Sequence, residues 1–251
     1  MIIDITKSGY RRGYLPREGV GVFHPFFATA NAAFRRQALI DAGGFDPGCA
    51  TGEDIDACIR MAGAGWELWF EPGAQVRHLH RQTLGALLSQ WFGYGLGHAR
   101  LFRKFAPPHR LQLYRYAPDD DPRNPLGIRC MLSLPSPIGG MIFLSSFNLA
   151  WSVWTMAALI TLFRPDGAAL LVPVALALIG LTAALVYVGR RFDVRHPGRS
   201  MALCGLRLLA DAVYVAGGLL GGLRCGLIYV EATRTRRRSA RPTAMRQGEG
   251  L

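Results

Sequence analysis

The hydrophobic and polar positions divide this chain into two unlike parts. Up to about residue 137, short apolar runs alternate with glycine, proline and charged positions, and most of the acidic residues lie here. Beyond that point, residues 139–163 and 167–189 each contain no charged residue. Each run exceeds the ~20 apolar residues that an α-helix needs to cross a bilayer. The pattern therefore predicts an α/β lobe followed by a membrane region.

Between residues 23 and 105 the spacing of apolar positions predicts the elements of the α/β lobe. A strand is expected over residues 26–30, and Asn31 is expected to cap a helix that runs to Ile40. A second helix should begin near Thr51 or Gly52, because its apolar positions share one face. Two strands and a longer helix complete the lobe, over residues 66–70, 74–78 and 83–104.

The segments that flank the lobe have no clear periodicity. Residues 1–22 are expected to be irregular, and residues 106–137, rich in Pro, Arg and Asp, are expected to form a polar linker without regular structure. Residues 231–251 are expected to form a basic disordered tail.

The two uncharged runs predict a transmembrane helical hairpin over residues 138–190, because only residues 164–166 separate them. One arginine lies in the turn and four lie just beyond the second helix, which places the turn outside and both flanks in the cytosol. The chain is thus expected to be a multi-pass protein of the plasma (inner) membrane, with the lobe and the tail cytosolic.

Residues 191–230 predict a basic loop and then a membrane-associated helix. Arg207, Asp211 and Arg224 interrupt its apolar stretch, and a charge at mid-bilayer costs about 3 kcal/mol on insertion scales. An amphipathic interfacial or re-entrant helix therefore fits better than a third span. The glycine pairs at 217–218 and 221–222 fit either close helix packing or a kink.

The formal net charge of +12 comes from 29 Lys plus Arg against 17 Asp plus Glu. In a soluble protein this would suggest nucleic acid as the partner. Beside membrane segments, basic residues instead contact anionic lipid head groups, so membrane lipids are expected and nucleic acid is not. The five cysteines form no C-x-x-C pair, which favours free thiols over a disulfide framework or a zinc site. The first residues do not form a signal peptide.

Gly52-Glu53-Asp54-Ile55-Asp56 is the densest cluster of chemically useful side chains, with three carboxylates at the start of a predicted helix. The partial positive charge at a helix start stabilises acidic residues, which is a sufficient structural reason for them. A carboxylate held there could also act as a general base. The residues alone leave both interpretations open.

The order of short motifs around this cluster resembles the second half of the family 2 glycosyltransferase domain, over about residues 23–105. This resemblance implies a partial GT-A, Rossmann-like lobe and an inverting transfer with Asp54 as the general base. It implies supporting roles for Glu53 and Asp56, and substrate contacts from Thr29, Asn31, Gly52, Arg81 and Gln82. The motifs are residues 28–36, 42–46, 52–60, 65–68 and 72–78.

The resemblance also implies a divalent metal, Mn or Mg, with His78 as a ligand and His80 on the same strand face as the alternative. The family's nucleotide-binding half, with its Asp-x-Asp motif, should precede residue 20. Asp119-Asp120-Asp121 does not replace it, because it follows the lobe. We therefore expect the metal to bind weakly or only together with that half, which would lie in a longer protein or on a separate chain.

These expectations combine into a non-processive, hexosyltransferase-like enzyme, or a fragment of one. It would move a sugar from a nucleotide-sugar donor to a lipid-linked or envelope glycan acceptor at the cytosolic membrane face. The Gln-x-x-Arg-Trp motif of processive relatives does not match residues 90–94, whereas Tyr94-Gly95 resembles a segment that lines the acceptor site in non-processive members. The alternative is a non-catalytic membrane protein that keeps a degenerate lobe as an interaction surface.

Overall fold

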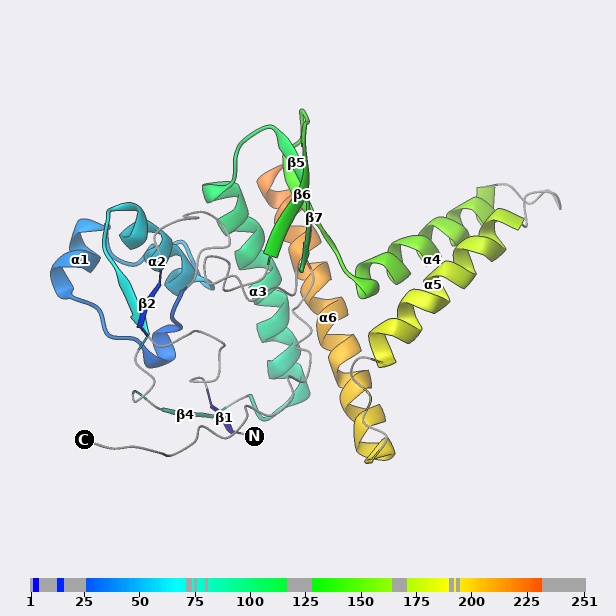
Figure 1. Ribbon diagram of the computed structural model, residues 1–251, viewed down its shortest axis with the longest axis horizontal. Coiled ribbons are helices and arrows are strands. Elements are labelled where there is room, and N and C mark those ends of the chain that lie inside the picture. The colour runs from blue at the N-terminus through cyan, green and yellow to red at the C-terminus, as the bar shows by residue number, and fades with distance from the viewer. Residues whose placement is uncertain are drawn as a thin grey trace, which may run out of the picture.

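The computed structural model describes residues 2–4, 13–15, 26–70, 74, 76–79, 81–116, 128–163, 171–189, 192 and 195–231. It shows a mixed α/β part followed by long helices, as predicted (Figure 1). The helices are α1 (Arg36–Asp41), α2 (Glu53–Gly63), α3 (Leu84–Phe105), α4 (Ser146–Phe163), α5 (Leu171–Gly189) and α6 (Pro197–Cys225). The strands are β1 (Ile2–Asp4), β2 (Gly13–Leu15), β3 (Leu68–Phe70), β4 (Arg77–Leu79), β5 (Arg110–Tyr116), β6 (Ile128–Pro135), β7 (Gly140–Leu144) and β8 (Ile228–Val230).

Helix α2 begins where the sequence predicts, directly after Gly52. Gly52 has a φ of 80°, a left-handed conformation that a side chain would strain, so the chain turns sharply into the helix. Ile55 and Ile59 on α2 pack against Leu101 of α3. Cys58 packs with Leu68 of β3 and with partly buried phenylalanines. This apolar face fixes the start of α2 against α3.

The segment before α1 differs from the prediction. Residues 26–28 form no strand, and Thr29–Asn31 form a single 3-10 turn. Helix α1 begins only at Arg36 and has no side-chain cap, so the prediction that Asn31 caps it is wrong. The amide of Asn31 donates instead to the carbonyl of Ala74, 2.9 Å away. The Asn31 side chain, which local propensity would place at a helix cap, therefore makes a long-range hydrogen bond instead.

Helices α3 and α6 lie side by side through the centre of the molecule (Figure 1). An added Cβ at Gly95 would lie 2.2 Å from the carbonyl oxygen of Tyr214, and one at Gly217 would lie 2.2 Å from that of Phe92. Gly217 and Gly221 of α6 thus serve close helix packing against α3, and α6 continues unbroken from Pro197 to Cys225. This settles the choice left open by the sequence.

Strands β5, β6, β7 and β8 form one mixed sheet in the order β6-β5-β7-β8. Strand β5 is antiparallel to β6 and parallel to β7, and β8 is parallel to β7. Its buried side chains, among them Met141, Phe143 and Tyr229, form a core with Ala99 and Phe102 of α3. The prediction of a structureless linker over 106–137 is therefore wrong for residues 110–116 and 128–135. Asp119-Asp120-Asp121 lies outside the described residues.

The predicted hairpin corresponds to helices α4 and α5, which project together from the rest of the molecule (Figure 1). The uncharged run that begins at residue 139 is not one helix, because residues 140–144 form β7 before α4 starts at Ser146. Helices α4, α5 and α6 are each long and apolar enough to cross a membrane. Large apolar side chains such as Trp151 (64% exposed) and Phe163 (75%) have no protein cover, which a bilayer would supply.

Strands β1 and β2 come from the first segment of the chain, which was predicted to be irregular. The segment over residues 1–22 is not wholly irregular, because β1 pairs with β4 and β2 pairs with β3, both antiparallel. The strands expected over 66–70 and 74–78 are observed as the shorter strands β3 and β4. Each of them pairs with a strand of this early segment. Residues 232–251 of the predicted tail lie outside the described residues.

Candidate active site

Asp54 lies in the first turn of α2, half-buried, with its Oδ1 accepting a hydrogen bond of 2.8 Å from the backbone N–H of Ile55. Burial raises the pKa of this carboxyl above its ordinary value, and the neighbouring charge of Glu53 adds to the rise, although the Ile55 bond opposes it. A carboxylate with a raised pKa accepts a proton more readily near neutral pH. Asp54 therefore has the property that a general base needs.

The structure brings Thr29, one of the predicted site residues, into contact with Glu53 and Asp54. The hydroxyl group of Thr29 donates to Glu53 Oε1 at 3.2 Å, and the backbone of Thr29 also bonds to Asp54. The hydrogen bond from the Asn31 amide to the Ala74 carbonyl holds residue 74 next to the 3-10 turn of Thr29–Asn31. Thr29, Asn31 and Gly52 thus order the backbone and the carboxylates at the start of α2.

Helix α3 forms the other side of this site. The hydroxyl group of Thr51 donates to the carbonyl of Gly93 at 2.8 Å, and an added Cβ at Gly97 would lie 2.2 Å from that hydroxyl oxygen. The loop that leads into Glu53 and Asp54 is thereby seated on α3. The charge of Asp54 raises the pKa of Tyr94, after the larger effect of burial, while Arg81 opposes this shift. Tyr94 and Arg81 therefore lie in electrostatic range of the cluster, and Gln82 is exposed beside Arg81.

His98, one helical turn beyond Tyr94, forms a polar cluster that the sequence did not indicate. Its Nδ1 lies 2.7 Å from the Tyr214 hydroxyl oxygen and 3.1 Å from Glu231 Oε2. The hydroxyl groups of Tyr214 and Tyr229 both donate to that same oxygen, Tyr229 at 2.6 Å. The four-residue spacing of Gln90, Tyr94 and His98 could have indicated a polar stripe on α3. Nothing in the sequence relates Glu231, 133 positions away, to His98.

Asp56, the third carboxylate of the motif, faces away from solvent and is fully buried. Arg60 Nε, one helical turn on, donates to its Oδ2 at 2.8 Å, and Lys104 Nζ of α3 lies 2.5 Å from its Oδ1. Arg60 also donates to the carbonyls of Ala42 and Gly44. Asp56 therefore ties α2 to α3 and to the turn after α1.

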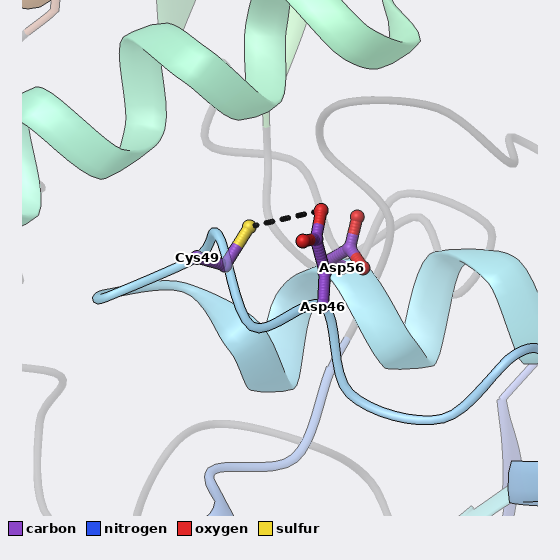
Figure 2. Close-up of side chains that lie close together, drawn as sticks. All are labelled: Asp46, Cys49 and Asp56. Carbon is purple, nitrogen blue, oxygen red and sulfur yellow. Dashed lines mark hydrogen bonds between the residues drawn. The ribbon is translucent and has the colours of Figure 1, made fainter.

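Asp46, Cys49 and Asp56 lie close enough together to suggest a metal site (Figure 2). Their potential ligand atoms lie within 4.8 Å of one another. However, Lys104 Nζ bonds both carboxylates, at 3.2 Å to Asp46 and 2.5 Å to Asp56, and so neutralises them. Burial raises the pKa of the Cys49 thiol, and a protonated thiol is a poor ligand. The group does not fit a divalent ion while Lys104 is bound there.

His78, the predicted metal ligand, lies in β4 opposite Ile3 of β1. In Figure 1 the pair of β1 and β4 lies apart from α2. His80, the alternative ligand, lies outside the described residues. The described residues thus assemble no complete metal site, and the metal-ligand role of His78 stays a prediction.

Comparison with known proteins gives the class to which this fold and these carboxylates belong. A family model described as "Glycosyl transferase family group 2" matches residues 15–188, more than half of the chain. The chain is therefore a member of glycosyl transferase family 2, as the order of motifs implied.

Individual relatives match over shorter segments. The "Pre-mycofactocin glycosyltransferase" of Mycobacterium tuberculosis is 39% identical over 70 residues, 28% of this chain and 15% of that protein. The "Succinoglycan biosynthesis protein ExoA" of Rhizobium meliloti is 32% identical over 74 residues, 30% and 22% of the two chains. The "O-antigen chain rhamnosyltransferase WbaN" of Salmonella anatum is 30% identical over 82 residues, 33% and 26%. The matched segment thus spans about a quarter or less of each relative, and no solved structure matches the chain.

Proposed function

We propose that this chain acts in an inverting, non-processive glycosyl transfer from a nucleotide-sugar donor to a glycan or lipid-linked acceptor at a membrane surface. Asp54 is the general base. The observation that carries this proposal is the half-buried Asp54 carboxyl at the start of α2, with its raised pKa, in a member of glycosyl transferase family 2. Three relatives named for glycosyl transfer or polysaccharide synthesis match part of the chain.

The reaction needs a base because an acceptor hydroxyl group is a weak nucleophile at neutral pH. Asp54 takes the hydroxyl proton while the oxygen bonds to the anomeric carbon, and the electrons of the breaking bond leave with the nucleotide diphosphate. Glu53, held by Thr29, keeps a second negative charge beside Asp54, which favours proton uptake. The buried Asp56 supports the site through α2 rather than by touching substrate.

The membrane placement follows from the helices that come after the site. Helix α5 bonds to α6 through Tyr187 and Asp211, and α6 packs on α3. The hairpin of α4 and α5 would thereby keep Asp54, at the start of α2, beside the bilayer, where an acceptor with a lipid anchor would present its sugar. A cytosolic site at the inner membrane remains our proposal from the arginine distribution. The leaving diphosphate needs cationic ligands or a divalent metal, Mn or Mg, and the described residues do not assemble a site for that metal.

The test is the replacement of Asp54 in the full-length protein, with Asp41→Asn as the matched control. Asp41 is an exposed aspartate at the end of α1, bonded to Gln37. Membranes containing each protein are incubated with a panel of radiolabelled nucleotide sugars, and label is counted in the lipid extract and in the polymeric residue. Asp54→Asn should lower transfer about 10²- to 10⁴-fold, and Asp41→Asn should leave it unchanged.

Transfer that survives Asp54→Asn at the wild-type rate would show that this carboxylate is not the base. A cellular role that persists without any transfer would instead favour the non-catalytic interaction surface. The stereochemistry is checked separately, because an inverting enzyme yields a product whose anomeric configuration is opposite to that of the donor.

A further inference from the structure

We propose that His98, oriented by Glu231, donates a hydrogen bond from its Nε2 to a hydroxyl oxygen of the acceptor, and that the Tyr94 hydroxyl group donates a second one. This inference rests on the proposed role of Asp54. It extends the site from α2 onto α3 and onto the residue that follows β8.

The polar stripe of α3 supplies the two donors. The side chain of Gln90 donates to the Tyr94 hydroxyl oxygen at 2.8 Å, which leaves the Tyr94 proton available for a substrate oxygen. The rings of Tyr94 and His98 stack, with centroids 6.5 Å apart and planes inclined by 20°. The two side chains therefore lie next to each other on one face of α3.

Glu231 decides which nitrogen of His98 carries which role. Because Nδ1 faces the Glu231 carboxylate and the Tyr214 oxygen, it holds a proton and donates it to them. The Tyr214 proton goes to Glu231, so the Tyr214 oxygen is left to accept. Among the residues that the structure describes, none bonds to Nε2, and 29% of the His98 side chain is exposed. Nε2 is thus the nitrogen left for a ligand.

Donation from Nε2 requires the imidazolium form. With Nδ1 protonated, the neutral ring leaves Nε2 as a bare acceptor, and only a second proton turns it into a donor. The groups that face His98 are Glu231, Tyr214, Tyr94 and Asp54. Burial alone would lower the pKa of His98, but the charge of Glu231 and its hydrogen bond outweigh burial and raise it. The charges of both carboxylates therefore favour the protonated ring, and the position of Glu231 Oε2 against Nδ1 supplies the geometric reason.

Tyr94 and His98 both lie within electrostatic range of Asp54, which assigns these donors to the acceptor rather than to the donor diphosphate. Thr51 seats the start of α2 on Gly93 and Gly97, and Tyr94 and His98 are the next positions along α3. In a displacement with inversion, the nucleophile attacks from the side opposite the leaving group. Groups around the base therefore flank the acceptor. His98 keeps its proton throughout, since the acceptor proton passes to Asp54.

The experiment uses full-length protein in lipid nanodiscs with a saturating radiolabelled donor. The acceptor probe is a total glycolipid extract of the producing cells, added over a range of concentrations. Two rates are followed, transfer to the extract and hydrolysis of the donor by water without extract. His98→Gln should raise the apparent KM for the extract about 10- to 100-fold and lower the ratio of transfer to hydrolysis correspondingly. His196→Gln, which replaces an exposed histidine before α6, should change neither rate.

Glu231→Gln tests the orienting role through its pH profile. In the wild type, the apparent KM should rise as the pH passes above the raised pKa of His98. Without the Glu231 charge, that rise should begin at a lower pH, nearer the ordinary value of 6.5. An unshifted profile in Glu231→Gln, or an unchanged KM in His98→Gln, would overturn the proposal. Activity that survives Asp54→Asn would refute the general base instead, so the two failures are distinguishable.

Discussion

Gly95 lies at a point where α3 approaches α6 tightly, and its replacement by alanine tests whether this packing holds the site together. An added Cβ would lie 2.2 Å from the carbonyl oxygen of Tyr214 and 2.6 Å from the amide nitrogen of Gly218. Carbon–oxygen contacts normally begin near ~3.3 Å. Because both neighbours are backbone atoms, no rotamer change relieves the overlap, and the helices must separate by about 1 Å.

Gly95→Ala should lower the free energy of unfolding by about 1–3 kcal/mol, the usual range for overpacking a close interface. The gain in helix propensity, up to ~1 kcal/mol, opposes this cost and is included in the lower end of the range. Separation would also move Tyr214 away from His98, so the ratio of glycosyl transfer to donor hydrolysis should fall with stability. Thermal unfolding in nanodiscs and the two rates described above measure both effects.

Gly205→Ala is the matched control, because Gly205 lies inside α6 and an added Cβ there meets nothing within 4 Å. It should leave stability unchanged or raise it by up to ~1 kcal/mol. If Gly95→Ala unfolds at the same temperature as the wild type, the close contact of α3 and α6 does not exist as described.

Two further predictions concern residues outside the proposed acceptor contacts. Lys104→Met should destabilise the protein by roughly 1–3 kcal/mol in a thermal unfolding assay, because Asp56 is fully buried and, among the described residues, would keep only Arg60 as a cation. The control Arg100→Met removes a longer ion pair to Asp46 and should cost less than ~1 kcal/mol. Equal losses in the two variants would contradict the role given to Lys104. Burial raises the pKa of the Cys58 thiol to about 11, so Cys58 should resist iodoacetamide at pH 8 while the exposed Cys130 reacts. Mass spectrometry of the labelled, folded protein measures both reactions. Prompt labelling of Cys58 would mean that α2 opens readily.

Local patterns predicted the helices well because the signals lie within each element. The apolar face of α2, the uncharged runs of α4 and α5, and the cap of α3 are all readable over a few residues. Thr83 caps α3 as a threonine at a helix start should, since its side chain accepts a bond from Ala86 N at 3.2 Å.

The strands were harder to predict because their partners are remote. Strand β5 lies between β6 and β7, and β7 pairs with β8, which follows three long helices. No spacing within residues 106–137 indicates these pairings. The same distance hides Glu231 from any argument that begins with His98. For Asn31 a local pattern predicted too much. It is a good capping residue, but its side chain bonds to the carbonyl of Ala74 and caps no helix.

The contact between α5 and α6 bears on how the membrane region carries the site. Tyr187, near the end of α5, donates at 2.7 Å to Asp211, which lies midway along α6 and is also paired with Arg207. Helices α4 and α5 leave α6 at a wide angle (Figure 1). If the hairpin crosses the bilayer and α6 lies along the interface, as its charges predict, the middle of α6 lies at the membrane boundary. Such a placement would hold α3 and Glu231 at the lipid surface, where the acceptor sugar of a lipid-linked glycan would meet Asp54.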